Sequence, residues 1–365
     1  MELISVTSED ALIREVAKTT KSVEFFIGGL DVIFRSLKDA SWGQLEHLTL
    51  SGVNLHEQLT LLWPQDLVLP RLRTVTLLPG DGPDPDLPYS EGRLESLRSL
   101  LRAHSEQLEC VRIKSYVELL AHLADALPSG LRRLEFEEFT VPSDAAALRR
   151  THGLKELKID IWLEDELYEQ ACIELEHFFR APGQLERLEL LRYHLPSINL
   201  GAGGLKSLQC LVLGGCYYDS LLEELAGLPR LRSLIIFCPH PRPLPEVFRE
   251  ITPAVIPALE VVVVSDNEEP CNRSPCVCPD FYSNGTACTR VPRLISELQG
   301  LVRRAPARLH AIYKYETMFF RHPVSETAGC PLCREASVEA VAALHDHYMG
   351  RTHIKLDGSV QCVKV

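Results

Sequence analysis

Apolar and polar residues alternate along this chain in a short phrase, apolar-x-x-apolar-x-apolar, that recurs nine times. The copies start at Leu45, Leu72, Leu108, Leu131, Leu154, Leu185, Leu208, Leu231 and Leu259, at spacings of 23 to 36 residues. A degenerate earlier copy lies at 23–27, and a weak later one starts at Leu309. Because side chains on a strand alternate between its two faces, each phrase predicts a short strand with one buried face.

Between the phrases, the leucines follow the period of a helix. Leu94, Leu97, Leu100 and Leu101 fall on one helical face, and the stretches 117–127 and 163–179 behave likewise. A strand followed by a helix cannot bury its apolar face alone, so consecutive repeats are expected to stack on one another. Residues 8–22 are expected to form an amphipathic helix that caps the first repeat.

The repeats resemble the leucine-rich repeat family from Leu45 to about Val264. The resemblance implies an α/β leucine-rich repeat solenoid, a horseshoe with strands on its concave side and helices outside, followed by a small Cys/His-rich C-terminal module. The irregular repeat lengths are most similar to those of intracellular F-box-associated proteins, although no F-box is seen ahead of the repeats. The expected segments are an N-terminal cap with a degenerate repeat at 1–44, the leucine-rich repeats at 45–269, a Cys-rich loop with a basic helical segment at 270–329, and a zinc finger at 330–365.

The residues between the apolar positions of each phrase point to the exposed face of its strand. In the central copies these residues are charged, namely Arg132, Arg133, Glu135, Lys155, Glu156, Lys158, Glu186, Arg187 and Glu189. In later copies they become apolar and aromatic, and aromatic clusters on a rigid surface are typical interface anchors. The predicted partner-binding residues are Arg187, Arg192, Tyr217, Tyr218, Ile235 and Phe237. Two alternatives stay open: a solvated face with weak ion pairs, and aromatic side chains packed under a neighbouring loop.

Near the C-terminus, Cys330 and Cys333 form a C-x-x-C, and His347 and His353 follow on a predicted helix. Zinc prefers four tetrahedral sulfur and nitrogen ligands, so these four residues predict one structural zinc ion. The segment is similar to the matrin-type two-Cys two-His zinc fingers of spliceosomal and double-stranded-RNA-binding proteins. Fortuitous spacing and a redox-active cysteine pair are the alternatives.

Four further cysteines, Cys271, Cys276, Cys278 and Cys288, lie in a stretch rich in Pro, Asn and Gly that reads as a loop. Whether they are free, bound to a second zinc ion or oxidised is left open by their spacing. In a secreted repeat protein, such a loop would be held by disulfides.

The net charge of −12 argues against affinity of the whole molecule for nucleic acid or an anionic membrane. The longest aliphatic run, 261–264, is too short to span a membrane, and the N-terminus has no signal-peptide pattern. These features predict a cytoplasmic or nuclear protein. No phosphate-binding loop, nucleophile elbow or zinc-protease motif occurs, so we expect no enzymatic activity.

The sequence thus predicts a non-enzymatic protein–protein interaction scaffold that binds its partner on the concave face of the repeats. By resemblance, the nearest role is that of a substrate-recognition subunit of a ubiquitin ligase. One alternative is an RNA- or ribonucleoprotein-binding protein that acts through the zinc-finger-like module, next to the basic stretch 289–322. The other is a secreted, receptor-like repeat protein.

Overall fold

The structure is a computed structural model, and it describes most of the repeat region and little of the chain beyond it. The described residues are 17–26, 42–53, 69–79, 89–114, 119–139, 142–151, 153–161, 165–181, 183–191, 200, 203–214, 221–237, 248–252, 255–265, 297, 300–301 and 310–314. The chain divides into two compact units, 1–192 with 197–207 and 193–196 with 208–365. This division falls inside the predicted repeat segment 45–269, where the sequence pattern shows no break.

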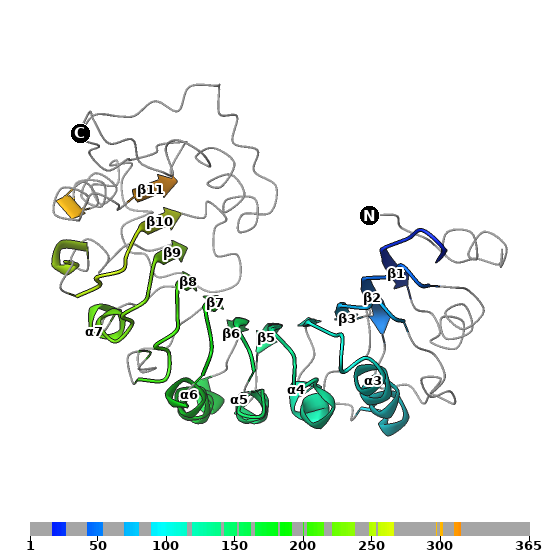
Figure 1. The fold of residues 1–365 in the computed structure, drawn as a ribbon. Helices are drawn as coiled ribbons and strands as arrows, with labels where there is room; N and C mark the ends of the chain where they lie inside the picture. Colours follow the sequence, from blue (N-terminus) through cyan, green and yellow to red (C-terminus); the bar gives the residue numbers. More distant parts are fainter. Residues whose placement is uncertain are drawn as a thin grey trace, which may run out of the picture. The chain divides into compact units, whose positions relative to one another are not determined.

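In the first unit, parallel strands follow one another in the order of the sequence (Figure 1). They are β1 (Ser22–Phe26), β2 (His47–Val53), β3 (Thr74–Pro79), β4 (Cys110–Lys114), β5 (Arg133–Phe139), β6 (Glu156–Ile161) and β7 (Arg187–Leu191). Each of these strands coincides with a repeated phrase, and β1 coincides with the degenerate copy at 23–27. The predicted α/β class with a strand in each repeat is therefore confirmed in this unit.

The helices of the first unit lie along one side of its strands (Figure 1). They are α3 (Glu91–Ala103), α4 (Leu119–Leu123), the 3-10 turn η1 (Ala124–Ala126), α5 (Pro142–Leu148) and α6 (Asp165–Arg180). The helices that the leucine periods predict are thus present as α3, α4 and α6. Of the predicted capping helix 8–22, only residues 17–22 are described. Ala17 is helical, but Ser22 already belongs to β1, so the helix ends earlier than predicted.

The second unit repeats the same arrangement. Its strands β8 (Cys210–Gly214), β9 (Ser233–Phe237), β10 (Val261–Ser265) and β11 (His310–Lys314) are parallel and neighbours in sequence order. Helix α7 (Leu221–Ala226) connects β8 to β9. The weak copy that starts at Leu309 is therefore a strand, paired with β10.

Alternate residues of each strand form the core of the unit. Leu48, Val75, Val111 and Leu134 occupy one register position on neighbouring strands, and each is completely buried. A second buried register position, two residues further along, contains Phe136 between Ile113 and Ile159. The apolar positions of the phrase therefore point toward the core, and the residues between them form the opposite face of the sheet.

Most of the described repeats are linked by a backbone hydrogen-bonding pattern at the residue before the strand. In the first unit, the carbonyl of Arg73 accepts hydrogen bonds from the amides of Glu109 and Cys110, both at 2.9 Å. The carbonyl of Glu109 in turn accepts from the amides of Arg132 and Arg133, both at 3.0 Å. The same pattern joins Gln209 to the next repeat in the second unit. Main-chain atoms therefore link one repeat to the next.

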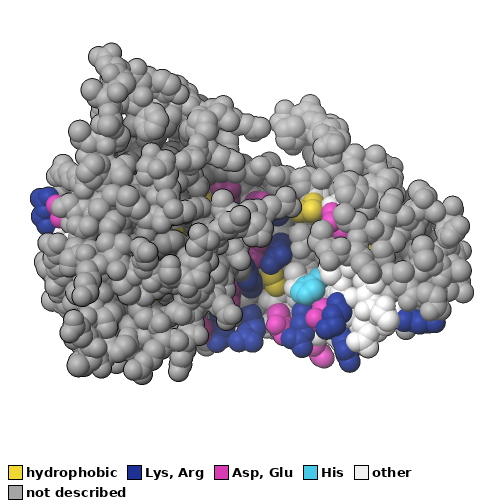
Figure 2. Space-filling view, turned by 90° about the horizontal axis from the view of Figure 1, so that it is seen from above, with side chains coloured by type: hydrophobic (Ala, Val, Ile, Leu, Met, Phe, Trp, Pro, Cys, Tyr) yellow, Lys and Arg dark blue, Asp and Glu magenta, His cyan; other side chains and the backbone are white. Residues whose placement is uncertain are grey.

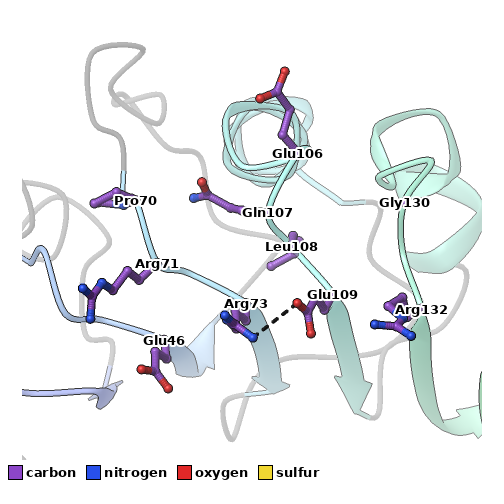
Figure 3. Close-up of a pocket in the computed structure, with 10 residues that line it drawn as sticks. All are labelled: Glu46, Pro70, Arg71, Arg73, Glu106, Gln107, Leu108, Glu109, Gly130 and Arg132. Atoms are coloured by element: carbon purple, nitrogen blue, oxygen red, sulfur yellow. Dashed lines mark hydrogen bonds and ion pairs between the residues drawn. The ribbon is translucent and has the colours of Figure 1, made fainter.

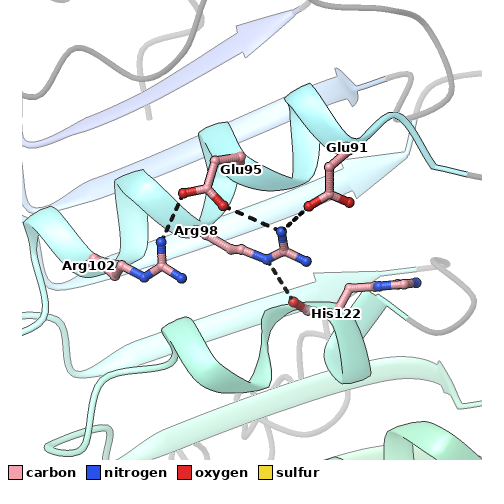
Figure 4. A network of polar contacts seen from close by, with 5 residues as sticks. All are labelled: Glu91, Glu95, Arg98, Arg102 and His122. Carbon is pink, nitrogen blue, oxygen red and sulfur yellow. Dashed lines mark hydrogen bonds and ion pairs between the residues drawn. The ribbon is translucent and has the colours of Figure 1, made fainter.

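Side chains link neighbouring helices as well (Figure 4). Arg98 of α3 donates a hydrogen bond from Nε to the carbonyl of His122 in α4, at 3.1 Å. Its Nη1 atom lies 2.5 Å from Glu91 Oε1 and 3.4 Å from Glu95 Oε2, and Glu95 also pairs with Arg102 at 2.9 Å. Arg98 thus joins two helices while two carboxylates of its own helix hold it in position.

Replacing Arg98 by alanine is expected to lower the free energy of unfolding by about 1 kcal/mol, because a half-buried side chain loses its bond to the next helix. Arg102→Ala is the matched control, since the Arg102 side chain is 52% exposed against 18% for Arg98 and pairs only within α3. The control is expected to cost less than about 0.5 kcal/mol. Urea unfolding followed by circular dichroism measures both, and equal losses would contradict the role of Arg98 between helices.

Candidate functional site

A charged surface covers the open side of strands β4 to β7 in the first unit. We call it the charged face, and it consists of Arg112, Lys114, Arg133, Glu135, Glu137, Glu156, Lys158, Asp160, Arg187 and Glu189. These residues occupy the strand positions between the buried apolar ones, so the strand pleat directs them away from the core. Figure 2 shows acidic and basic side chains intermingled over the described part of the surface.

Two acidic groups of the charged face, Glu135 and Glu137, each lie close to two basic groups. Glu135 lies between two arginines, with Arg112 Nε at 3.1 Å and Arg133 Nε at 2.6 Å. Glu137 lies between two lysines, with Lys114 Nζ at 3.0 Å and Lys158 Nζ at 3.6 Å. The pairs with Arg112 and Lys114 cross from β4 to β5, the pair with Lys158 crosses from β5 to β6, and the pair with Arg133 lies within β5. The face is therefore a network in which each charge limits the movement of the next.

The network continues toward β7. Arg133 also reaches Glu156, with Nη1 3.3 Å from Oε2. In β7, Arg187 and Glu189 pair within the strand at 2.7 Å. Arg187, a predicted partner-binding residue, therefore belongs to the charged face and is half-buried there.

In the two pairs that join β4 to β5, the acidic side chain is the more buried member. The Glu135 side chain is 10% exposed, whereas the Arg112 side chain with which it pairs is 40% exposed. The same holds for Glu137 and Lys114, at 27% and 39%. Removing one partner of a buried ion pair leaves an uncompensated charge and is costly. Glu135 and Glu137 thus hold the more exposed cations Arg112 and Lys114 in position.

Cys110 is a potential nucleophile on the charged side of β4, but its thiol is not activated. Its side chain is buried, and burial together with the nearby carboxylate of Glu135 raises the pKa of the thiol to about 11. The thiolate is the reactive form of cysteine. Cys110 is therefore protonated at neutral pH and poorly nucleophilic.

A pocket of about 460 Å³ lies at the edge of the first unit where the strands begin (Figure 3). Its lining residues come from consecutive repeats and are Glu46, Pro70, Arg71, Arg73, Glu106, Gln107, Leu108, Glu109, Gly130 and Arg132. Inside it, Arg73 Nη1 lies 3.4 Å from Glu109 Oε1. Three arginines and three glutamates line the pocket, so their formal charges cancel. The pocket therefore does not select a ligand by net charge.

Most of the predicted aromatic anchor site lies outside the described residues, including Arg192, Tyr217 and Tyr218. Only the backbone of Phe237 is described, as the last residue of β9. Ile235 differs from the prediction, because its side chain is 2% exposed and so is buried instead of open to a partner. It lies in register with Val212 and Val263 on the neighbouring strands, where adjacent apolar side chains exclude water.

The predicted zinc ligands Cys330, Cys333, His347 and His353 lie outside the described residues, and so do Cys271, Cys276, Cys278 and Cys288. Within the described ranges, no group of three or more His, Cys, Asp or Glu side chains is arranged to hold a metal ion. The helices among those residues include none with the length and apolar character needed to cross a membrane. The zinc site stays a prediction from the sequence.

Sequence reasoning missed the two exposed cations of β4, Arg112 and Lys114. The signal was present, because the phrase that starts at Leu108 places Arg112 between two buried residues and Lys114 just after them. The prediction of a charged face was based on the copies that start at Leu131, Leu154 and Leu185, which correspond to β5, β6 and β7. The register of β4 with β5 then shows that these cations belong to the same network.

No protein-family model matches this chain, and no curated protein matches it. The function therefore has to be argued from the geometry of the described residues.

Proposed function

We propose that this chain is a leucine-rich repeat protein that acts as a non-enzymatic scaffold and binds a protein partner through the charged face. The repeated phrase, the one strand in each repeat and the parallel order of the strands within each unit support the repeat assignment. In such an array each repeat contacts its neighbours, and the strand faces combine into an extended binding surface.

The observation that carries the proposal is the network around Glu135 and Glu137. A partner that binds charged side chains does so more tightly when those side chains are already held in place, because less conformational entropy is lost on binding. The ion pairs across β4, β5 and β6 provide this preorganisation. Complementary charges at an interface also fix the register of the partner.

A role as a substrate-recognition subunit of a ubiquitin ligase remains a proposal from the resemblance of the repeats alone. The charged face fits that role, since substrate recognition requires a preformed surface and no catalytic group on this chain.

Exchanging charges on the charged face is expected to remove bound partners without unfolding the protein. The face variant is Lys114→Glu with Lys158→Glu, and the control is Arg149→Glu with Arg180→Glu, which carries the same change of charge on the helix side. Affinity purification from cells with quantitative mass spectrometry compares both variants with the wild type. Proteins that co-purify with the wild type should decrease by about tenfold or more in the face variant and persist in the control, since like charges at an interface cost several kcal/mol.

Thermal unfolding of both variants shows that any loss of partners is not a loss of fold. If the same proteins persist with the face variant, or disappear only with the helix-side control, the charged face is not the binding surface.

A further inference from the structure

We infer that the β4 side of the charged face binds an acidic segment of a partner protein, one with Asp or Glu at every second position. This inference rests on the proposed function and names the chemistry of the partner. It is carried by the two partly exposed cations of β4, Arg112 and Lys114, by the deeper burial of the carboxylates that pair with them, and by the uncharged strand β3 on their other side.

The two cations project from the same face of one strand. Arg112 and Lys114 are separated by one buried residue, Ile113, so their side chains leave the strand about 6.6 Å apart. An extended peptide has the same spacing between alternate side chains. Two carboxylates at positions i and i+2 of a partner segment therefore match the two cations.

Both cations have donors to spare. Arginine carries five N–H donors and lysine three, and one carboxylate cannot use all of them. Glu135 forms an ion pair with Arg112, with Oε2 3.1 Å from Nε, and Glu137 forms one with Lys114, with Oε2 3.0 Å from Nζ. Because those carboxylates are the more buried members of their pairs, a partner meets the cations first.

The neighbouring strand β3, Thr74–Pro79, contains no charged residue. On β3, Thr76 lies in register with Arg112, and Thr74 with Cys110. On the other side, β5 supplies the two glutamates already paired with Arg112 and Lys114. An added carboxylate would thus approach over the threonine side of β4, away from Glu135 and Glu137.

The chain as a whole carries a net charge of −12, which would repel an acidic segment at long range. At physiological salt, however, charges are screened beyond about 8 Å, so the contacts with Arg112 and Lys114 themselves decide binding. The attraction is therefore local to Arg112 and Lys114, and salt is expected to weaken it steeply.

The test uses the full chain and three fluorescein-labelled hexapeptides, Gly-Glu-Ser-Glu-Ser-Gly and its counterparts with Gln or Lys in place of Glu. Fluorescence anisotropy at physiological salt, where the net negative charge of the chain is screened, is expected to show binding of the Glu peptide and none of the other two. Arg112→Gln with Lys114→Gln should lower the affinity for the Glu peptide by about tenfold or more, since charge-assisted hydrogen bonds are stronger than neutral ones. Arg102→Gln with Arg180→Gln, two exposed arginines of the helix layer, should leave it unchanged.

The inference is overturned if the Glu peptide does not bind, or if it binds the β4 variant as tightly as the wild type. It is also overturned if a uridine hexanucleotide binds more tightly than the Glu peptide and loses affinity in the same variant. Binding of the Lys peptide that is lost with Glu156→Gln would also overturn it, while leaving a protein-binding charged face intact. The proposed function fails separately, through the partner purification with the Lys114 and Lys158 variant. Circular dichroism of each Gln variant excludes unfolding as the cause of lost binding.

Discussion

Phe136→Ala is expected to lower the free energy of unfolding by about 3–5 kcal/mol, the largest effect of any single substitution proposed for this chain. Phe136 is completely buried in β5, in register with Ile113 of β4 and Ile159 of β6. The alanine variant loses the transfer free energy of the ring and leaves a cavity between three strands. Neighbouring strands hold each other through backbone hydrogen bonds, so they can close that cavity only in part.

Urea unfolding at neutral pH measures this loss. Phe136→Leu leaves a smaller cavity and is expected to lower the free energy of unfolding by less than the alanine variant does. Arg132→Ala, at the exposed edge of the same repeat, is expected to change it by less than about 0.5 kcal/mol. A leucine variant as unstable as the alanine variant would mean that the shape of the ring, and not the volume it fills, stabilises the core.

The second large effect concerns His104, a buried imidazole that follows α3. Its side chain makes two hydrogen bonds to the backbone: Nε2 lies 3.0 Å from the amide of Leu69, and Nδ1 lies 2.8 Å from the carbonyl of Leu100. An amide can only donate, so Nε2 is the acceptor and Nδ1 carries the proton. His104 is thus neutral in the folded protein, and burial lowers its pKa below the ordinary value of 6.5.

This shift makes stability depend on pH in a definite direction. Below pH 6.5 the unfolded chain takes up a proton at His104 that the folded chain does not, so stability falls as the pH falls from 6.5 toward the lower pKa of the folded state. Above pH 6.5 both states are neutral, and His104 contributes no pH dependence. His104→Leu should cost about 2 kcal/mol at pH 7.5, because it leaves backbone groups of Leu69 and Leu100 without their bonds.

The measurement is the difference in unfolding free energy between the wild type and His104→Leu, taken from pH 7.5 to pH 5. This difference is expected to shrink as the pH decreases, whereas the difference for His177→Leu, an exposed histidine of α6, should stay small throughout. A difference for His104→Leu that is constant with pH would show that the folded state accepts a proton at His104 after all.

The strands of this fold could be predicted from sequence because their signal is local. A phrase such as the one at Leu108 places Val111 and Ile113 on one side of β4 and leaves Arg112 on the other, and the structure has this arrangement. The helices α3 and α6 could be predicted equally well, since their apolar residues recur at helical spacing.

His104 shows where local pattern stops being informative. In other repeats an apolar residue such as Leu69 or Leu228 is buried at the start of the turn before the strand, and its carbonyl accepts the hydrogen bond that closes the turn. In the repeat of β4 the corresponding carbonyl belongs to His104. From sequence alone a histidine is expected to be polar and exposed. His104 can be buried because the Leu69 amide donates a hydrogen bond to its Nε2, and only the structure shows that this amide lies nearby.

The candidate site was partly predictable for the same reason. The charged character of Arg133, Glu135 and Lys158 follows from their places in the phrase, but the partners of each charge depend on which residues face one another across strands. Repeats of 23 to 36 residues do not disclose that register. Ile235 was misjudged because an apolar residue at a face position is buried once its neighbours in register are apolar too.

Before most of the described strands, one carbonyl accepts two hydrogen bonds from the following repeat. This pattern affects how the edge where the strands begin can evolve. Because the carbonyl of Arg73 and the amides of Glu109 and Cys110 belong to the main chain, any residue except proline at the donor positions preserves the bonds. Substitutions along this edge can therefore alter recognition one residue at a time and keep the main-chain bonds between repeats, at the cost only of exposed ion pairs such as Arg73 with Glu109. A lineage of such proteins is free to exchange its ligands rapidly, and a designer can graft a new charge pattern onto the edge without rebuilding the fold.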